Sequence, residues 1–159
     1  MRPIISKLAP TVVSIAVVFV SCLAAPGDAR ATLGGSLESV TSNEQRLGAV
    51  RRIQGLAAGE RHDLELPSGT VVHEYVSSTG IVYGISWRGP RIPDLRELMG
   101  AYFAQLERRD ARAAAGHHRL SVAGADLVVQ SSGHQHAVVG RAWVPSLVPP
   151  GVDARVVVE

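Results

Sequence analysis

Two histidines late in the chain have the residue type and spacing for metal chemistry. His134 and His136 are alternate residues of a predicted strand, which would place both imidazoles on one face, where they could hold a zinc ion. A third ligand would come from His117, His118 or Asp126, although no spacing specifies one. Because catalytic zinc sites have three protein ligands, a metal-dependent hydrolase using His134 and His136 stays an alternative interpretation.

Three arginines surround the start of a predicted helix and could bind an anion. Arg88, Arg91 and Arg96 lie on either side of Asp94. Free amides at a helix N-terminus attract phosphate or carboxylate, and guanidinium groups pair with both. Asp94 is itself a good cap for those amides, so the three arginines could equally mark a structural corner. They are kept as a candidate binding site for an anion or a partner.

Serine hydrolase chemistry has less support. Ser86 lies between Gly84 and Gly89, which leaves one residue too many for the nucleophile turn of that enzyme class. His73 and Glu74 are neighbours in a predicted strand and therefore face opposite sides of the sheet. The sequence contains no phosphate loop, dinucleotide fingerprint or calcium loop. We therefore predict no catalytic residue and favour a protein that is not an enzyme.

The first 31 residues are typical of a secretory signal peptide. Arg2 and Lys7 precede an apolar run over residues 12–25, which is shorter than the roughly 20 residues of a membrane span. Ala29 and Ala31 form a small-residue cleavage pattern, so the mature chain is expected to begin after Ala31. Export follows, with the periplasm as the expected compartment and secretion as an alternative. No membrane span is expected after cleavage.

Cys22 raises a second possibility for the same segment. Bacterial lipoproteins are cut just before a cysteine that then carries the lipid, and Ser21 suits the position before such a cut. An outer-membrane lipoprotein anchored through Cys22 is therefore an alternative. With cleavage after Ala31, the mature chain has no cysteine and no lysine, and equal numbers of acidic and basic residues. That balance gives no reason to expect a nucleic-acid partner.

The pattern after the leader predicts a single small domain. Residues 32–59 read as an arm, loose over 32–43, with a possible short helix near 44–54, and residues 60–159 read as one α+β domain. Within that domain, residues 63–66 and 70–76 form a hairpin, and a third strand places Ile81, Tyr83, Ile85 and Trp87 on one face. Gly84 and Ser86 lie opposite and leave room for a packed helix.

The helix is the clearest element in the sequence. It begins at Asp94, carries an apolar stripe to Leu106 and ends at Gly116, while Gly100 suggests close contact with the sheet. Three strands follow, separated by turns at Gly124 and Gly133, and residues 153–159 predict a last short strand. The order βββ-α-βββ indicates an antiparallel sheet of about six strands with one amphipathic helix packed on it.

Three stretches of the sequence are distinctive: Leu66-Pro-Ser-Gly-Thr-Val-Val-His-Glu-Tyr-Val-Ser-Ser-Thr-Gly80, Val82-Tyr-Gly-Ile-Ser-Trp-Arg-Gly-Pro90 and Pro93-Asp-Leu-Arg-Glu-Leu-Met-Gly-Ala-Tyr-Phe103. Together they resemble a bacterial family known as domain of unknown function 2844. The similarity continues through residues 126–129 and 134–145. The resemblance implies a small exported protein of Gram-negative bacteria, and it carries no activity, cofactor or catalytic residue.

A non-enzymatic envelope protein fits these observations best. We expect it to bind another envelope protein or a cell-surface polymer, because the chain is exported and lacks catalytic motifs. Residues 156–158 could contribute to the binding of a protein partner by pairing, as a strand, with the edge of its sheet. The oligomeric state is left open by the sequence.

Overall fold

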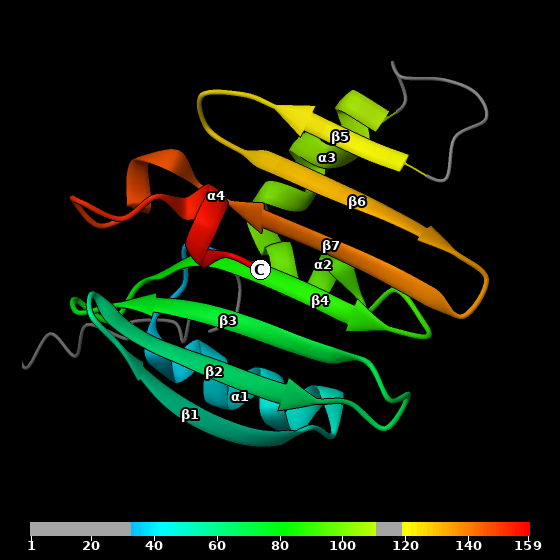
Figure 1. The fold of residues 1–159 in the computed structure, drawn as a ribbon, viewed down its shortest axis with the longest axis horizontal. Coiled ribbons are helices and arrows are strands. Elements are labelled where there is room, and N and C mark those ends of the chain that lie inside the picture. Colours follow the sequence, from blue (N-terminus) through cyan, green and yellow to red (C-terminus); the bar gives the residue numbers. More distant parts are fainter. Residues whose placement is uncertain (1–32, 111–118) are drawn as a thin grey trace, which may run out of the picture.

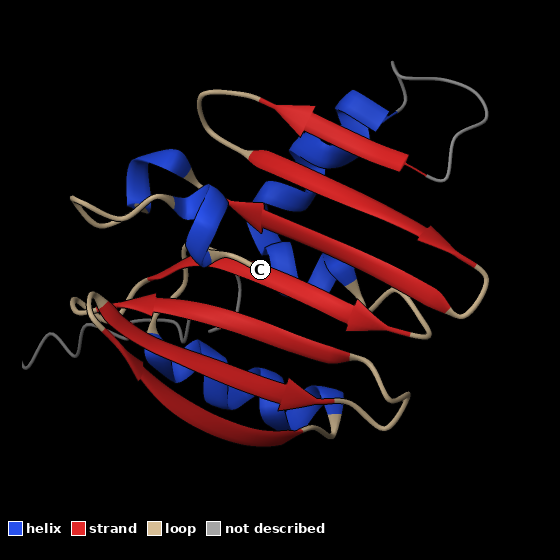
Figure 2. Cartoon of the chain, viewed as in Figure 1, coloured by secondary structure: helices blue, strands red, loops and turns tan. Residues whose placement is uncertain are grey.

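The computed structural model describes residues 33–110 and 119–159, which form one antiparallel sheet with helices on its faces (Figures 1 and 2). The elements in chain order are α1 (Leu37–Leu47), β1 (Val50–Leu56), β2 (Gly59–Glu65), β3 (Val71–Ser77), β4 (Val82–Gly89), α2 (Leu95–Met99), the 3₁₀ turn η1 (Gly100–Tyr102), α3 (Phe103–Asp110), β5 (Arg119–Ala123), β6 (Val128–His134), β7 (Ala137–Trp143), η2 (Pro145–Leu147) and α4 (Ala154–Val157).

The sheet has seven strands in the order β1-β2-β3-β4-β7-β6-β5, and every neighbouring pair is antiparallel. The predicted α+β class and the antiparallel sheet are therefore confirmed. One strand more than expected is present, because residues 50–56 form β1 and pair with β2 over seven positions. Edge positions belong to β1 and β5.

Helices α1, α2 and α3 cover one face of the sheet, and the main core lies between them (Figure 1). Val40 of α1 and Leu98 and Met99 of α2 are buried against strand residues such as Ile85 and Trp87. This burial of apolar surface is the main stabilising contribution to the fold. On the opposite face, which we call the open face, the segment after β7 is the only covering element among residues 33–110 and 119–159.

The predicted start of the central helix is confirmed, but its interior is not a continuous α-helix. Asp94 accepts hydrogen bonds from the amides of Arg96 (2.9 Å) and Glu97 (3.1 Å). Gly100 has a φ of 48°, a backbone conformation that L side chains rarely adopt, and the helix passes there through η1. The positive φ accounts for a glycine at position 100, where the sequence had suggested close contact with the sheet. The predicted helix end at Gly116 lies outside the described residues.

The N-terminal helix lies earlier than the predicted range of 44–54. Helix α1 ends at Gly48, which has a left-handed conformation (φ 59°), and the chain turns there into β1. The predicted loose arm is also wrong for residues 33–36, because they are tied to the domain. The amides of Leu33 and Gly34 donate to carbonyls of Leu98 and Val82, and the Leu33 side chain is buried.

A bulge in the sheet overturns the prediction that Tyr83 shares a face with Ile85 and Trp87. The register between β3 and β4 shifts between Tyr75 and Val76, so the side-chain alternation changes phase at that point. Ile85 and Trp87 enter the main core, whereas Tyr83 belongs to a second cluster on the open face. Alternation over a whole strand assumes an unbroken ladder, which β4 does not have.

The expectation that Gly84 and Ser86 leave room for a packed helix is wrong. These small residues face the C-terminal segment instead. A Cβ on Gly84 would lie 2.7 Å from a methyl group of Val158, and the Ser86 hydroxyl donates to the backbone carbonyl of Glu159. Val158 is fully buried in the second cluster with Tyr75 and Trp143. The segment therefore packs across the open face of the sheet at β3 and β4.

Two further predictions in the second half of the chain are wrong. The β6–β7 hairpin turns at residues 135–136, because Gly133 lies within β6 opposite Val138. The predicted last strand over residues 153–159 is instead the helical turn α4, capped by Asp153, whose carboxylate accepts from the Arg155 amide. Residues 156–158 are thus not a strand available for pairing with another sheet.

Within residues 33–110 and 119–159, none of the helices is long and apolar enough to span a membrane. The predicted signal peptide, the cleavage site after Ala31, and Cys22 all fall outside the described part of the chain.

Candidate functional site

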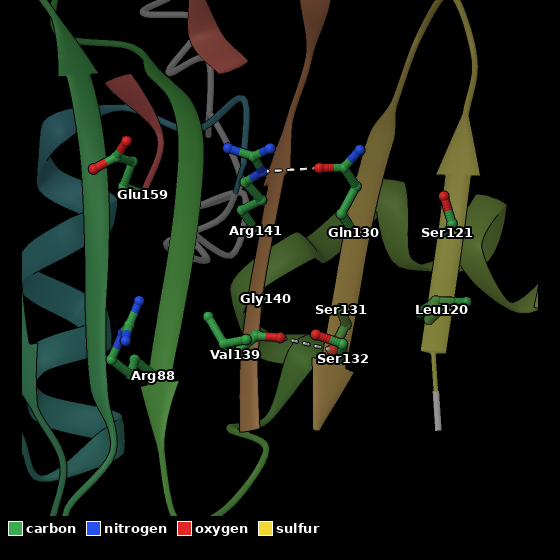
Figure 3. Close-up of a pocket in the computed structure, with 10 residues that line it drawn as sticks. All are labelled: Arg88, Leu120, Ser121, Gln130, Ser131, Ser132, Val139, Gly140, Arg141 and Glu159. Carbon is green, nitrogen blue, oxygen red and sulfur yellow. Dashed lines mark hydrogen bonds between the residues drawn. The ribbon is translucent and has the colours of Figure 1, made fainter. Parts of the chain in front are cut away.

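The open face holds a hollow of about 660 Å³, which we call the arginine groove. It extends over β4, β7, β6 and β5 beside the C-terminal segment (Figure 3). Its lining residues are Arg88, Leu120, Ser121, Gln130, Ser131, Ser132, Val139, Gly140, Arg141 and Glu159. The only acidic side chain among them is Glu159, and the arginines, the serines and Gln130 supply hydrogen-bond donors.

Register brings the two arginines of the groove together. Ser86 of β4 pairs with Arg141 of β7, and Arg88 pairs with Val139, so Arg88 and Arg141 are diagonal neighbours on one face. Such neighbours are about 7–8 Å apart, a span that long side chains can bridge. Figure 3 shows the Arg141 side chain beside Gln130, with Arg88 across β7 on β4 and Ser121 farther along the groove on β5. Both arginines therefore line the same hollow.

The arginines differ in how far their hydrogen-bonding capacity is already used. Arg141 donates from Nε to Gln130 (2.9 Å), and from one terminal nitrogen to the carbonyls of Arg155 (2.7 Å) and Val158 (3.2 Å). Its other terminal nitrogen has no partner among the described residues. Arg88 is exposed and has no hydrogen-bond or ion-pair partner in that part of the chain.

Contacts from the sheet fix the C-terminal segment at the border of the groove. Besides Arg141, the Tyr75 hydroxyl donates to the Glu159 carbonyl (3.0 Å) and accepts from the Glu159 amide (3.1 Å). The Arg141 guanidinium also lies over the Trp143 ring, 5.5 Å from its centre. Arg141 therefore both lines the groove and stabilises one of its walls.

A separate charged cluster lies on the open face at β2 and β3. Asp63 accepts two hydrogen bonds from Arg61 (2.7 and 3.1 Å), and His73 Nδ1 lies 2.6 Å from the same carboxylate. Burial alone would raise the pKa of Asp63, but the contacts with Arg61 and His73 lower it below its ordinary value. All of these charges have partners within the cluster. Its arrangement is that of a structural ion-pair network.

Asp63, His73 and Ser86 lie in one row across β2, β3 and β4, a set of residue types used in acyl transfer. The Ser86 hydroxyl, however, donates to the Glu159 carbonyl, and the side chain is almost fully buried. A nucleophilic serine needs its hydroxyl directed at a base and accessible to substrate. The row therefore does not form a hydrolase site in this conformation.

The structure separates the three arginines that the sequence placed around one helix start. Only Arg88 reaches the open face. Arg91 is exposed in the loop after β4, and Arg96 on the helical side pairs with Glu107 (2.8 Å) and lies over the Phe103 ring at 4.5 Å. Asp94 occupies the helix amides, as we had considered. The predicted cluster of Arg88, Arg91 and Arg96 is thus not assembled.

The two candidate metal ligands do not share a strand face. His134 ends β6, whereas His136 lies in the hairpin turn with a left-handed φ of 63°. Asp126 lies in the loop at the opposite end of β6, and His117 and His118 are outside the described residues. Among the residues that the structure describes, no group of three or more histidine, cysteine, aspartate or glutamate side chains could hold a metal ion.

Sequence reasoning missed the role of Arg141 and Gln130. The available signal was alternation: Gln130 and Ser132 of β6, and Arg141 of β7, are polar residues in phase with one another in a hairpin. Recognising the groove also required knowing that β4 pairs with β7, although about 50 residues separate them. The local pattern identifies a polar strand face, and only the strand order places Arg88 on it.

Comparison with known proteins gives one relationship. No curated protein and no solved structure matches the chain. A family model described as "Protein of unknown function (DUF2844)" matches residues 29–157, which includes every strand and helix described above. The resemblance seen in the sequence is thereby confirmed, and the chain belongs to the DUF2844 family.

Proposed function

We propose that this chain is an exported, non-enzymatic module that binds an acidic polymer of the cell envelope in the arginine groove. The observation that carries the proposal is the exposed Arg88 guanidinium, which has no partner among the described residues and lines the same hollow as Arg141, its diagonal neighbour in the sheet. Guanidinium groups form paired hydrogen bonds with carboxylates and phosphates. A regularly spaced acidic chain would meet both groups.

The remaining lining supports a polar ligand that carries hydroxyl as well as acidic groups. Ser121 and Ser132 contribute hydroxyls, and Gln130 contributes an amide whose oxygen already accepts from Arg141. The amide nitrogen therefore remains as a donor. An acidic polysaccharide offers carboxylates and hydroxyls together, which suits this mixture of donors better than an apolar peptide does.

Export is part of the proposal and has its own test. A basic start and a short apolar run support a signal peptide, and cleavage after Ala31 would leave a chain beginning at Thr32. Intact-mass measurement of protein from the envelope fraction is expected to give that start. A lipid-bearing chain beginning at Cys22 would instead establish the lipoprotein. An uncut chain recovered from the cytoplasm would contradict export.

Reversing the charge of Arg88 is expected to abolish most of the binding. Arg88→Glu replaces a donor with a carboxylate facing an acidic ligand, and the affinity for polygalacturonate, a uronic-acid polymer, should fall by about tenfold or more. Isothermal titration calorimetry at low salt measures the effect, with neutral dextran as the uncharged polymer. The exposed position of Arg88 means that the variant should fold.

Arg52→Glu is the matched control, because Arg52 lies on the same open face but on β1, with a side chain that is 71% exposed. This variant carries the same charge change and should bind polygalacturonate nearly as well as the unmodified protein. Equal losses in both variants would mean that net charge and not the groove determines binding. Binding of polyglutamate alone would contradict the polysaccharide and indicate an acidic protein partner.

A further inference from the structure

Strand β1 presents an unpaired edge at one border of the sheet (Figure 1). It pairs with β2 at all seven of its residues, and no strand of the described chain pairs with its outer side. Backbone groups on the outer side of an edge strand can pair with a strand from another molecule. The edge is therefore a potential interaction surface, separate from the arginine groove.

Natural proteins usually protect such edges with proline, charged side chains or a bulge. Strand β1 has no proline and no bulge, and its two charged residues, Arg51 and Arg52, each pair with a carboxylate of their own chain. Its sequence is Val-Arg-Arg-Ile-Gln-Gly-Leu, and its register with β2 is unbroken. Val50 and Ile53 are 62% and 57% exposed, the two largest values among the large hydrophobic residues of the described strands. A long, regular edge with exposed apolar side chains favours strand addition.

We propose that β1 pairs antiparallel with β1 of a second copy, which would join two sheets across a twofold axis at Ile53. Full overlap of the strand with itself fixes this register. Ile53 then lies opposite Ile53, and Val50 lies opposite Leu56. The interface is isologous and closes on itself, as expected for a symmetric dimer.

Charge supports a second copy as the occupant of the edge. In this register Arg51 lies opposite Gly55 and Arg52 opposite Gln54, so no two arginines are directly opposed, and the two Arg52 residues are diagonal neighbours. Each arginine also has a carboxylate partner in its own chain: Arg51 contacts Glu44 (3.1 Å) and Arg52 contacts Glu65 (3.3 Å). Repulsion, which normally prevents two basic strands from pairing, is therefore reduced.

The dimer should be weak. Strand pairing over seven residues buries less than the roughly 1,200 Å² of a typical stable interface. Sedimentation velocity over protein concentrations from about 1 to about 500 µM is therefore the appropriate measurement, and we expect a dissociation constant on the order of tens of micromolar. A protein that stays monomeric over the whole range would overturn the proposal.

Ile53→Lys tests the centre of the interface, since it places two like charges opposite each other on the twofold axis. We expect the dissociation constant to rise about tenfold or more, while the exposure of Ile53 protects the monomer fold. Val156→Lys is the matched control, because Val156 is 63% exposed and lies in α4 on the open face. An unchanged dissociation constant in Ile53→Lys, or an equal rise in Val156→Lys, would contradict pairing at β1.

Gln54→Glu tests the register of the two strands, because a nonspecific apolar contact would have no defined register. It places a carboxylate opposite Arg52 of the second copy, twice in each dimer. The oxygen that accepts from Arg61 (2.7 Å) is kept. The dissociation constant should fall about fivefold at low salt, with the gain lost at high salt. A weaker or unchanged dimer at low salt would overturn this register.

Discussion

Trp87→Ala is expected to lower the free energy of unfolding by about 3–5 kcal/mol. The Trp87 side chain is 1% exposed and packs in the main core between the helices and the sheet. Its indole lies directly against the backbone of Gly140, where a Cβ would come within 2.2 Å of the ring. Removing the indole would leave a cavity bounded by strand backbone on one side, which cannot easily collapse. Urea denaturation followed by far-ultraviolet circular dichroism measures the loss.

Two further variants separate burial from other effects of this substitution. Trp87→Phe keeps an aromatic ring and removes Nε1, which has no partner among the described residues. The free energy of unfolding of this variant should therefore fall by only about 1–2 kcal/mol. Ile92→Ala truncates a side chain that is 57% exposed and should change the stability by less than about 0.5 kcal/mol. A Trp87→Ala variant as stable as Ile92→Ala would contradict the core position.

The elements that the sequence predicts well are those with strong local signals. The β2–β3 hairpin follows from alternation around Pro67-Ser-Gly69, and the start of α2 follows from Asp94, whose carboxylate caps two amides. In both cases the residues that determine the structure are within a few positions of one another. Local chemistry is sufficient there, and the structure agrees with it.

The errors arise where contacts distant in the sequence decide the local structure. Alternation in β4 fails at Tyr83 because a bulge changes the phase of the strand. The C-terminal segment has a strand-like composition, yet it forms α4, and Arg141 of β7 holds it there by donating to the carbonyls of Arg155 and Val158. Neither outcome can be read from β-branched residues or alternation alone, since tertiary packing overrides propensity.

For the candidate site, too, local signals were sufficient for one residue but not for its neighbours in space. The sequence predicts Arg88 as a candidate binding residue, but it supplies neighbours from the adjacent loop and helix, Arg91 and Arg96, which are close only in sequence. Its neighbour in the structure is Arg141, brought beside it by the pairing of β4 with β7. A groove made by four strands depends on strand order, and strand order is not encoded in local periodicity.

A second large effect is expected beneath helix α1, where a carboxyl group is buried. Glu74 is 1% exposed, and its Oε1 accepts a hydrogen bond from Asn43 of α1 at 2.7 Å. His62 of β2 lies opposite Glu74 and is equally buried. Burial raises the pKa of Glu74 to about 7, although the Asn43 hydrogen bond and the charge of Arg51 act in the opposite direction.

This shift makes the stability fall as the pH rises. In the folded protein Glu74 stays protonated up to about pH 7, whereas in the unfolded chain it ionises above its ordinary pKa of 4.5. Its stabilising contribution is therefore complete below pH 4.5 and is lost between pH 4.5 and pH 7. The free energy of unfolding should decrease by about 3 kcal/mol across that window. Denaturant titrations at intervals from pH 4 to pH 8 measure it.

Glu74→Gln provides the comparison that isolates this contribution. The variant keeps an oxygen for Asn43 but cannot ionise, so the decrease between pH 4.5 and pH 7 should be absent. His62 requires this control, because burial lowers its pKa below 6.5, and stability from His62 is therefore lost as the pH falls. The contribution of His62 is present in both proteins, so it cancels when the free energy of unfolding of Glu74→Gln is subtracted from that of the unmodified protein at each pH. Parallel pH profiles for the two proteins would mean that Glu74 is ionised and solvated in the folded state, and that α1 does not cover it as the structure describes.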